Sequence, residues 1–143
     1  MKSYKRDAIK NYFPMPNEIF SLGLSSGEIS VYSYLMFCED RKTFQCYPSY
    51  KTIGKAVKMS QNTVRKYVAK LEDKHLITTE PTKVYTSSGM VRNGNLLYTI
   101  LPIQQAIDYF HEQQILKVNE EFLKAKVKNT LNNSVKSHSK TAV

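Results

Sequence analysis

The stretch "YKTIGKAVKMSQNTVRKYV", residues 50–68, contains two short helical patterns separated by the bridge Lys58-Met59. Ser49 precedes the first pattern and Ser60 opens the second. Serine is a favoured N-cap residue because its hydroxyl accepts a hydrogen bond from a backbone N–H that has no partner inside the helix. The stretch therefore predicts two short helices joined by a tight turn.

Apolar residues in this stretch have the spacing that two helices crossing at a steep angle need. Such a pair needs inward apolar residues in both helices, a small residue where they approach closely, and an apolar residue in the turn. The residues that meet these needs are Ile53, Gly54, Val57, Met59, Val64 and then Tyr67 or Val68. Lys58 stands where glycine is common, and a left-handed backbone would cost lysine about 1–2 kcal/mol, so we expect a modified turn.

The sequence before this pair predicts a further helix and a brief strand. Ser25 and Glu28 have the spacing of a capping box, in which each side chain satisfies a backbone N–H of the other. Apolar residues then recur at helical spacing, which predicts a helix that ends near Asp40. The aromatic stretch 43–49 is flanked by turn-forming residues and predicts a short strand ending at Pro48.

The sequence after the pair changes from helical periodicity to strand composition. Residues 76–101 are rich in β-branched and aromatic side chains and contain the turn signals Ser88-Gly89 and Asn93-Gly94. We expect two strands, about 76–85 and 95–101, joined by a polar tip. Two registers stay open, because Asn-Gly alone favours a tighter hairpin, and Pro81 implies an edge position or a bulge.

These elements predict a mainly α fold with a small β-hairpin (α+β). We divide the chain into a flexible N-terminal arm (1–14), a central domain (15–102), a long C-terminal helix for packing or dimerisation (103–128) and a disordered tail (129–143). The tail is assigned as disordered because it has little apolar surface to bury.

Residues 17–102 resemble the winged helix-turn-helix domains common in bacterial regulators and in replication initiators of plasmids and other mobile elements. The motifs that carry the resemblance are Pro48-Ser49, the "SQNTV" of residues 60–64, Leu71 and Leu76-Ile77. The resemblance implies a sequence-specific double-stranded DNA-binding protein, acting in transcription regulation or in replication initiation. One fold hosts many roles, so the choice between these stays open.

The excess of basic residues indicates a negatively charged partner. The chain of 143 residues has a net charge of +9, which favours nucleic acid or an anionic membrane surface. Residues 49–74 contain seven lysines and arginines against two acidic residues, Glu72 and Asp73. We find no signal peptide and no segment of roughly 20 apolar residues that could span a bilayer, so we expect a cytoplasmic protein, nucleoid-associated when DNA is bound.

The outward side of the second short helix carries side chains suited to reading base edges, because Asn or Gln can pair with adenine and Arg with guanine. In this fold the start of that helix enters the major groove. We predict base contacts by Gln61, Asn62, Arg65 and Lys66. Predicted contacts to the DNA backbone come from Ser49, Tyr50, Lys51, Lys55, Ser60, Thr63 and Lys70. The hairpin, or wing, offers Lys83, Arg92, Asn93 and Asn95, although a polar hairpin tip is also a common solvated loop.

Other readings of the sequence concern partners and chemistry. The long C-terminal helix places Ile115, Val118 and Phe122 on one stripe, which is either a core face or, as we favour, the contact of a homodimer. The basic face could instead dock an acidic protein.

The cysteines, Cys38 and Cys46, match no disulfide framework or zinc pattern. We expect that the protein is not an enzyme, that it holds no metal or cofactor, and that it does not associate with a membrane.

Overall fold

The computed structural model describes residues 1–7 and 10–140, with the backbone alone for 138–140. The chain forms two compact units, Met1–Ile107 and a second that begins at Asp108. The described part of the expected arm contains no helix or strand, and residues 8–9 of that arm lie outside the described residues.

Helices of the first unit are η1 (Asn17–Ser21), α1 (Ser26–Cys38), α2 (Tyr50–Val57) and α3 (Gln61–Asp73). The predicted capping box is present, because the Glu28 backbone N–H donates to Ser25 Oγ and the Ser25 N–H donates to Glu28 Oε2, both at 3.3 Å. The predicted caps of the short helices are also confirmed, since Ser49 accepts from the Thr52 N–H and Ser60 from the Thr63 N–H.

The turn between α2 and α3 differs from the expectation of a modified geometry. Lys58 has φ 59° and ψ 50°, the left-handed conformation that glycine would take. Its backbone N–H and that of Met59 both donate to the Gly54 carbonyl, Met59 at 2.9 Å. The turn therefore keeps the glycine-type backbone, and the packing of the two helices outweighs the local cost to lysine.

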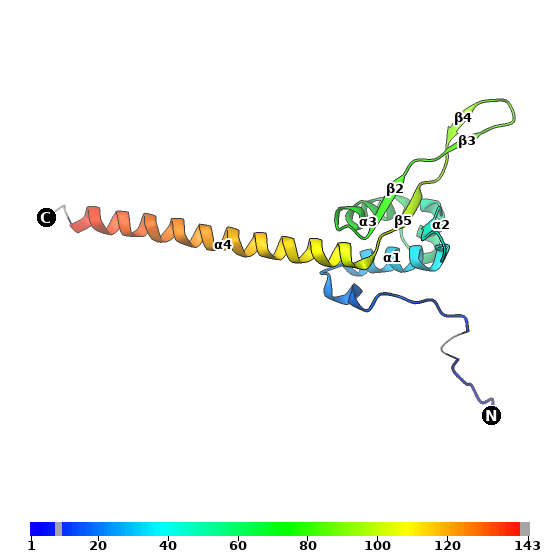
Figure 1. The fold of residues 1–143 in the computed structure, drawn as a ribbon, viewed down its shortest axis with the longest axis horizontal. Helices are drawn as coiled ribbons and strands as arrows, with labels where there is room; N and C mark the ends of the chain where they lie inside the picture. The colour runs from blue at the N-terminus through cyan, green and yellow to red at the C-terminus, as the bar shows by residue number, and fades with distance from the viewer. Residues whose placement is uncertain (8–9, 141–143) are drawn as a thin grey trace. The chain divides into compact units, whose positions relative to one another are not determined.

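The described residues contain five short strands, which form two sheets (Figure 1). The first sheet has the order β1-β5-β2 and is antiparallel, with β1 at Gln45–Cys46, β2 at Ile77–Glu80 and β5 at Leu97–Ile100. The second pairs β3 (Lys83–Tyr85) with β4 (Val91–Asn93) and projects beyond the first sheet as the wing.

The first strand expected after α3, 76–85, is broken into β2 and β3, whereas the second, 95–101, contains β5 alone, and β4 lies in the stretch expected to be the polar tip. The interruption falls at Pro81, which has no N–H to donate to a ladder, and opposite it at Gly94, whose N–H donates to the Thr82 carbonyl at 2.8 Å. The hairpin reverses at Ser88-Gly89, where Gly89 has φ 80°, and not at Asn93-Gly94. The register pairs Lys83 with Asn93.

The core lies between the three helices and the first sheet. Its fully buried large side chains include Ile19, Tyr32, Leu35, Ile53, Val64, Leu71, Leu76, Ile77 and Tyr98. Gly27 allows α1 and α3 to approach, because a Cβ there would lie 2.2 Å from the Tyr67 ring. In η1, Ile19 is buried but Phe20 is 80% exposed, and Leu22, which follows the helix, is buried.

The helix α4 spans Ile103–Lys140 and is longer than expected. The prediction of a disordered tail from 129 is wrong for residues 129–140, and residues 141–143 lie outside the described residues. The helix continues because no glycine or proline interrupts the sequence after Pro102. Low apolar content was therefore a poor guide to where this helix ends.

Candidate nucleic-acid interface

The outward side of α3 is exposed over its first two turns. Gln61, Asn62, Arg65 and Lys66, the predicted base contacts, are all exposed. The opposite side of the helix carries Val64, Val68 and Leu71, which are buried and fix the rotation of α3 on the body of the domain. The structure therefore brings the four predicted residues together on one solvent-facing surface, which we call the α3 face.

The caps of α2 and α3 leave backbone N–H groups available at both helix starts. The Ser49 and Ser60 hydroxyls each accept the N–H of the third residue of their helix and also lie 2.9 Å from the hydroxyl of that same threonine. Their hydrogen-bonding capacity is thus partly used by the caps. The N–H groups of the first two residues of each helix take no bond from the caps and carry the positive end of the helix dipole.

Basic side chains around the α3 face are not neutralised by the protein. Within the described part of the chain, no carboxylate lies at ion-pair distance from Lys51, Lys55, Arg65, Lys66 or Lys70. Charged residues near the C-terminal end of α3, in contrast, have partners within the protein. Lys74 Nζ lies 2.7 Å from Glu28 Oε2, and Glu72 accepts a hydrogen bond from the Thr79 N–H at 3.0 Å. The uncompensated positive charge is therefore concentrated toward the start of α3.

A groove lies where α2, α3 and the base of the wing meet. Its volume is about 430 Å³, and its lining includes Ser49, Tyr50, Arg65, Asn93, Asn95 and Tyr98. The Arg65 guanidinium carbon lies 5.5 Å from the centroid of the Tyr50 ring. Burial, and next the charge of the nearby Tyr50 hydroxyl, raises the pKa of Tyr98 above its ordinary value. A predicted base contact (Arg65), two predicted DNA-backbone contacts (Ser49 and Tyr50) and two predicted wing contacts (Asn93 and Asn95) thus line the same groove.

The wing residues do not share one face. Because Lys83 pairs with Asn93, and Val84 with Arg92, the alternation of side chains places Lys83 and Asn93 on one face of the hairpin and Arg92 on the other. All three are exposed. Asn95 lies below the hairpin, and its side-chain nitrogen donates to the Tyr47 carbonyl at 3.2 Å.

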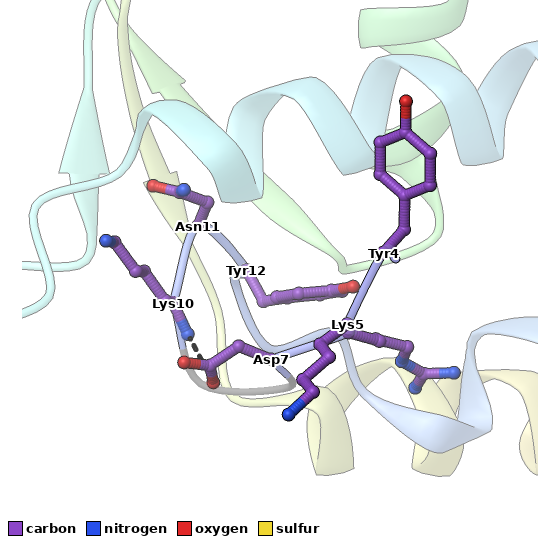
Figure 2. A pocket seen from close by; sticks show the side chains of 7 residues that line it. Tyr4, Lys5, Asp7, Lys10, Asn11 and Tyr12 are labelled. Carbon is purple, nitrogen blue, oxygen red and sulfur yellow. Dashed lines mark hydrogen bonds between the residues drawn. The ribbon is translucent and has the colours of Figure 1, made fainter. Parts of the chain in front are cut away.

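Two further hollows lie away from the α3 face. The first, about 390 Å³, includes Tyr32, Glu39, Arg41 and Phe44 in its lining. Burial raises the pKa of Glu39, and the Arg41 guanidinium at 2.8 Å partly opposes this. The second hollow, shown in Figure 2, is lined by residues 4–7 and 10–12 of the arm, where the Lys10 N–H donates to Asp7 Oδ1 at 3.3 Å. Its exposed lining comes from one segment alone, and we assign no site there.

The described residues contain no group of three His, Cys, Asp or Glu side chains able to hold a metal ion. No described helix combines the length and apolar character that crossing a membrane requires.

Sequence reasoning missed two contacts near the α3 face and the base of the wing. The Tyr50–Arg65 stack joins different helices, and the Asn95–Tyr47 hydrogen bond joins the wing to the segment before α2. Neither follows a helical or strand period, so periodicity gave no signal. The sequence shows only that a tyrosine directly follows the N-cap of one helix and that an arginine lies on the outward side of the next. The fold is needed to show that these two residues are in contact.

The order of three helices, a three-stranded sheet that includes a strand between the first two helices, and a projecting hairpin defines a winged helix-turn-helix fold. Residues 22–77 match the model of a family described as a helix-turn-helix domain. No curated protein sequence matches the chain.

Solved structures give weaker likenesses. A possible transcriptional regulator from Methanosarcina mazei Go1 is 19% identical, with 77% of this chain and 82% of that chain covered and a TM-score of 0.46. A mutant of S. aureus MepR, bound to an oligodeoxyribonucleotide, is 17% identical, with 81% and 83% covered and a TM-score of 0.41. The multiple antibiotic-resistance repressor of Listeria monocytogenes is 12% identical, with 84% and 76% covered and a TM-score of 0.40. We base the fold assignment on the elements and their pairing.

Proposed function

We propose that this protein binds double-stranded DNA in a sequence-specific manner through the α3 face and acts as a transcription regulator. The observation that carries the proposal is the α3 face itself, which combines amide and guanidinium side chains with uncompensated positive charge on a helix whose other side is fixed in the core. A helix fixed in this way can present its side chains to the major groove without rearranging.

The side chains of the α3 face divide by chemistry into two proposed roles. Gln61 and Asn62 can donate to and accept from adenine, and Arg65 can donate two hydrogen bonds to guanine, each good pair discriminating by about 1–3 kcal/mol. Lys66 has donors only, which suits guanine or a nearby phosphate. Because these residues occupy the first turns of α3, they would meet successive base pairs as the helix enters the groove.

Contacts to the DNA backbone would flank the base contacts. The lysines at 51, 55 and 70 add charge without a competing carboxylate among the described residues, and the free N–H groups at the starts of α2 and α3 suit phosphate oxygens. In the wing, Lys83 and Asn93 on one face of the hairpin, or Arg92 on the other face, would contact the DNA backbone or the minor groove, because one hairpin cannot turn both faces to the DNA. Asn95 is better placed to hold the wing base, since its amide nitrogen already donates to Tyr47.

Selection from random duplexes, followed by affinity measurements on the recovered site, tests the proposal. Arg65→Ala should reduce the preference for the selected site over random duplex by about 1–3 kcal/mol. Lys51→Ala is the matched control, because it also removes one positive charge but should weaken both duplexes alike. It should also reduce the salt slope by about 0.9, the contribution of one neutralised phosphate. Equal loss of discrimination in both variants would refute the assigned roles.

Other partners are outcomes of the same experiment. Failure to bind any duplex at moderate salt would favour the alternative that the basic face docks an acidic protein. If a site is recovered, its place in the genome separates two roles: a site at promoters supports transcription regulation, whereas repeated sites at a replication origin support a replication-initiation module of a mobile element.

We further propose that the protein forms a homodimer through α4. Eight large apolar residues of this helix are more than half exposed in the single chain: Ile115, Leu116, Val118, Phe122, Leu123, Val127, Leu131 and Val135. This is not the pattern of a helix buried in its own domain. A helix of 38 residues is about 57 Å long, and most helical stability in proteins comes from packing an apolar face. A second copy would supply that packing.

Sedimentation analysis of Phe122→Glu tests the dimer. Burying a phenylalanine contributes about 1.5–3 kcal/mol, so placing a charge there should weaken dimerisation at least tenfold. Lys126→Glu, a charge change elsewhere on the same helix, is the control. A dimer should select two half-sites about one helical turn of DNA apart, whereas a monomer with wild-type DNA affinity would contradict the proposal.

A further inference from the structure

The groove at the base of the wing holds an arginine and an aromatic ring from different helices. The Arg65 guanidinium carbon lies 5.5 Å from the centroid of the Tyr50 ring, within the range of a cation–π contact. Tyr50 is the first residue of α2 and is half-buried, and its hydroxyl lies close enough to the buried Tyr98 to raise the pKa of that phenol. Arg65, by contrast, is exposed.

A guanidinium stacked on a ring keeps its donors available. The N–H groups of arginine lie in the plane of the guanidinium, so contact through the flat face leaves the edge free to donate two parallel hydrogen bonds. In the part of the chain that is described, no carboxylate competes for this edge. The stack also limits the rotamers of a long side chain before any partner arrives, which reduces the entropy lost on binding.

The aromatic ring on α3 itself, Tyr67, has different neighbours. The Lys66 and Lys70 ammonium groups lie 5.9 Å and 5.7 Å from the centroid of the Tyr67 ring. That ring also fills the space above Gly27 and so holds α1 against α3. Ammonium groups have no flat face with which to stack and are free to turn on flexible stems. Of these three contacts, only the one between Tyr50 and Arg65 involves a planar donor.

We propose that Tyr50 is a positioning residue for Arg65: its ring holds the guanidinium in the orientation that reads a base, and Tyr50 itself is not primarily a contact to the DNA backbone. The inference rests on the proposed DNA-binding function and deepens it. It predicts that Tyr50 contributes to specificity only through Arg65. A ring without the hydroxyl would therefore be sufficient, and an aliphatic side chain of similar size would not.

A double-mutant cycle on the selected duplex tests this dependence. Tyr50→Leu should weaken binding to the selected site about three- to tenfold, the range of a partly solvated cation–π contact, and should lose preference at the base pair read by Arg65. Tyr50→Phe should bind within about twofold of the wild type, because the ring is retained. In an Arg65→Ala background, Tyr50→Leu should have almost no further effect. Tyr50→Met supplies the same test should the leucine variant unfold.

Lys51→Ala provides the control cycle. Lys51 neighbours Tyr50 in the chain but is not stacked on its ring, so the effects of Tyr50→Leu and Lys51→Ala should multiply. If the effects of Tyr50→Leu and Arg65→Ala also multiply, Tyr50 does not act through Arg65 and the proposal is overturned.

A measurement on the free protein separates this inference from the proposed function. Protons of the Arg65 side chain that lie over the Tyr50 ring should be shifted upfield by its ring current in the wild type and in Tyr50→Phe, and not in Tyr50→Leu. Absence of that shift in the wild type overturns the positioning role even if DNA is bound. A wild type that shows the shift but binds no duplex refutes the DNA-binding function, and the specificity role of Tyr50 falls with it.

Discussion

Replacing Gly54 by alanine sets two effects of known size against each other. Gly54 lies inside α2, where alanine is favoured over glycine by about 0.8–1.0 kcal/mol. A Cβ at this position, however, would lie 2.4 Å from the Met59 backbone oxygen, which is held in the turn and cannot rotate away as a side chain would. Overpacking of this kind costs about 1–3 kcal/mol, and a contact this short against backbone belongs at the upper end. We expect a net loss of about 1–2 kcal/mol in the free energy of unfolding.

Hydrogen exchange at the buried amides of Ile53, Val64 and Leu71 under increasing urea is the suitable assay, because far-ultraviolet circular dichroism would be dominated by the 38-residue helix α4. The exposed Ala56 of the same helix supplies the control: Ala56→Gly measures the propensity effect alone and should cost about 1 kcal/mol. A stabilised Gly54→Ala variant would show that the approach of α2 to the turn is not a steric requirement, and that the reasoning from the close contact is wrong.

Three further predictions concern the turn, a buried carboxyl and a buried thiol. Lys58→Gly should stabilise the domain by about 1 kcal/mol in urea unfolding, because it removes the left-handed strain, whereas the control Lys58→Ala removes the charge without this gain. Burial raises the pKa of Glu39, so the contribution of this carboxyl to stability is greatest below its unfolded pKa of about 4.3 and is lost as pH rises through the folded value. The melting temperature of Glu39→Gln relative to wild type should therefore increase from about pH 4 to pH 7. An unchanged difference between the two melting temperatures would contradict this. Burial, followed by the charges of Cys38 and Glu39, raises the pKa of Cys46 to about 12, so its alkylation at pH 8 should be about a thousandfold slower than that of an unfolded thiol by peptide mass spectrometry, and a rate close to the unfolded one would contradict its burial.

The sequence predicted the parts of the fold that depend on neighbouring residues. The caps at Ser25, Ser49 and Ser60 were recognisable because the capping serine and the backbone N–H that donates to it lie three residues apart. The buried stripe of α3 was recognisable because a helix repeats within four residues. The break of the wing strands at Pro81 was less clear, since the same sequence allowed a bulge or an edge strand, and only the opposing Gly94 decided it.

Features that depend on distant residues could not be predicted in this way. Lys58 takes a left-handed backbone because the helices on either side of it pack together, and no local preference for lysine indicates that outcome. The contact between Tyr50 and Arg65 likewise exists because the packing of α2 against α3 brings the two residues together at the helix crossing. The tight turn brings the two helices to this crossing, and the crossing places an aromatic platform under an arginine of the α3 face. The strain at Lys58 and the orientation of Arg65 are therefore consequences of one packing arrangement, and a change that loosens the turn should reduce DNA discrimination before it unfolds the domain.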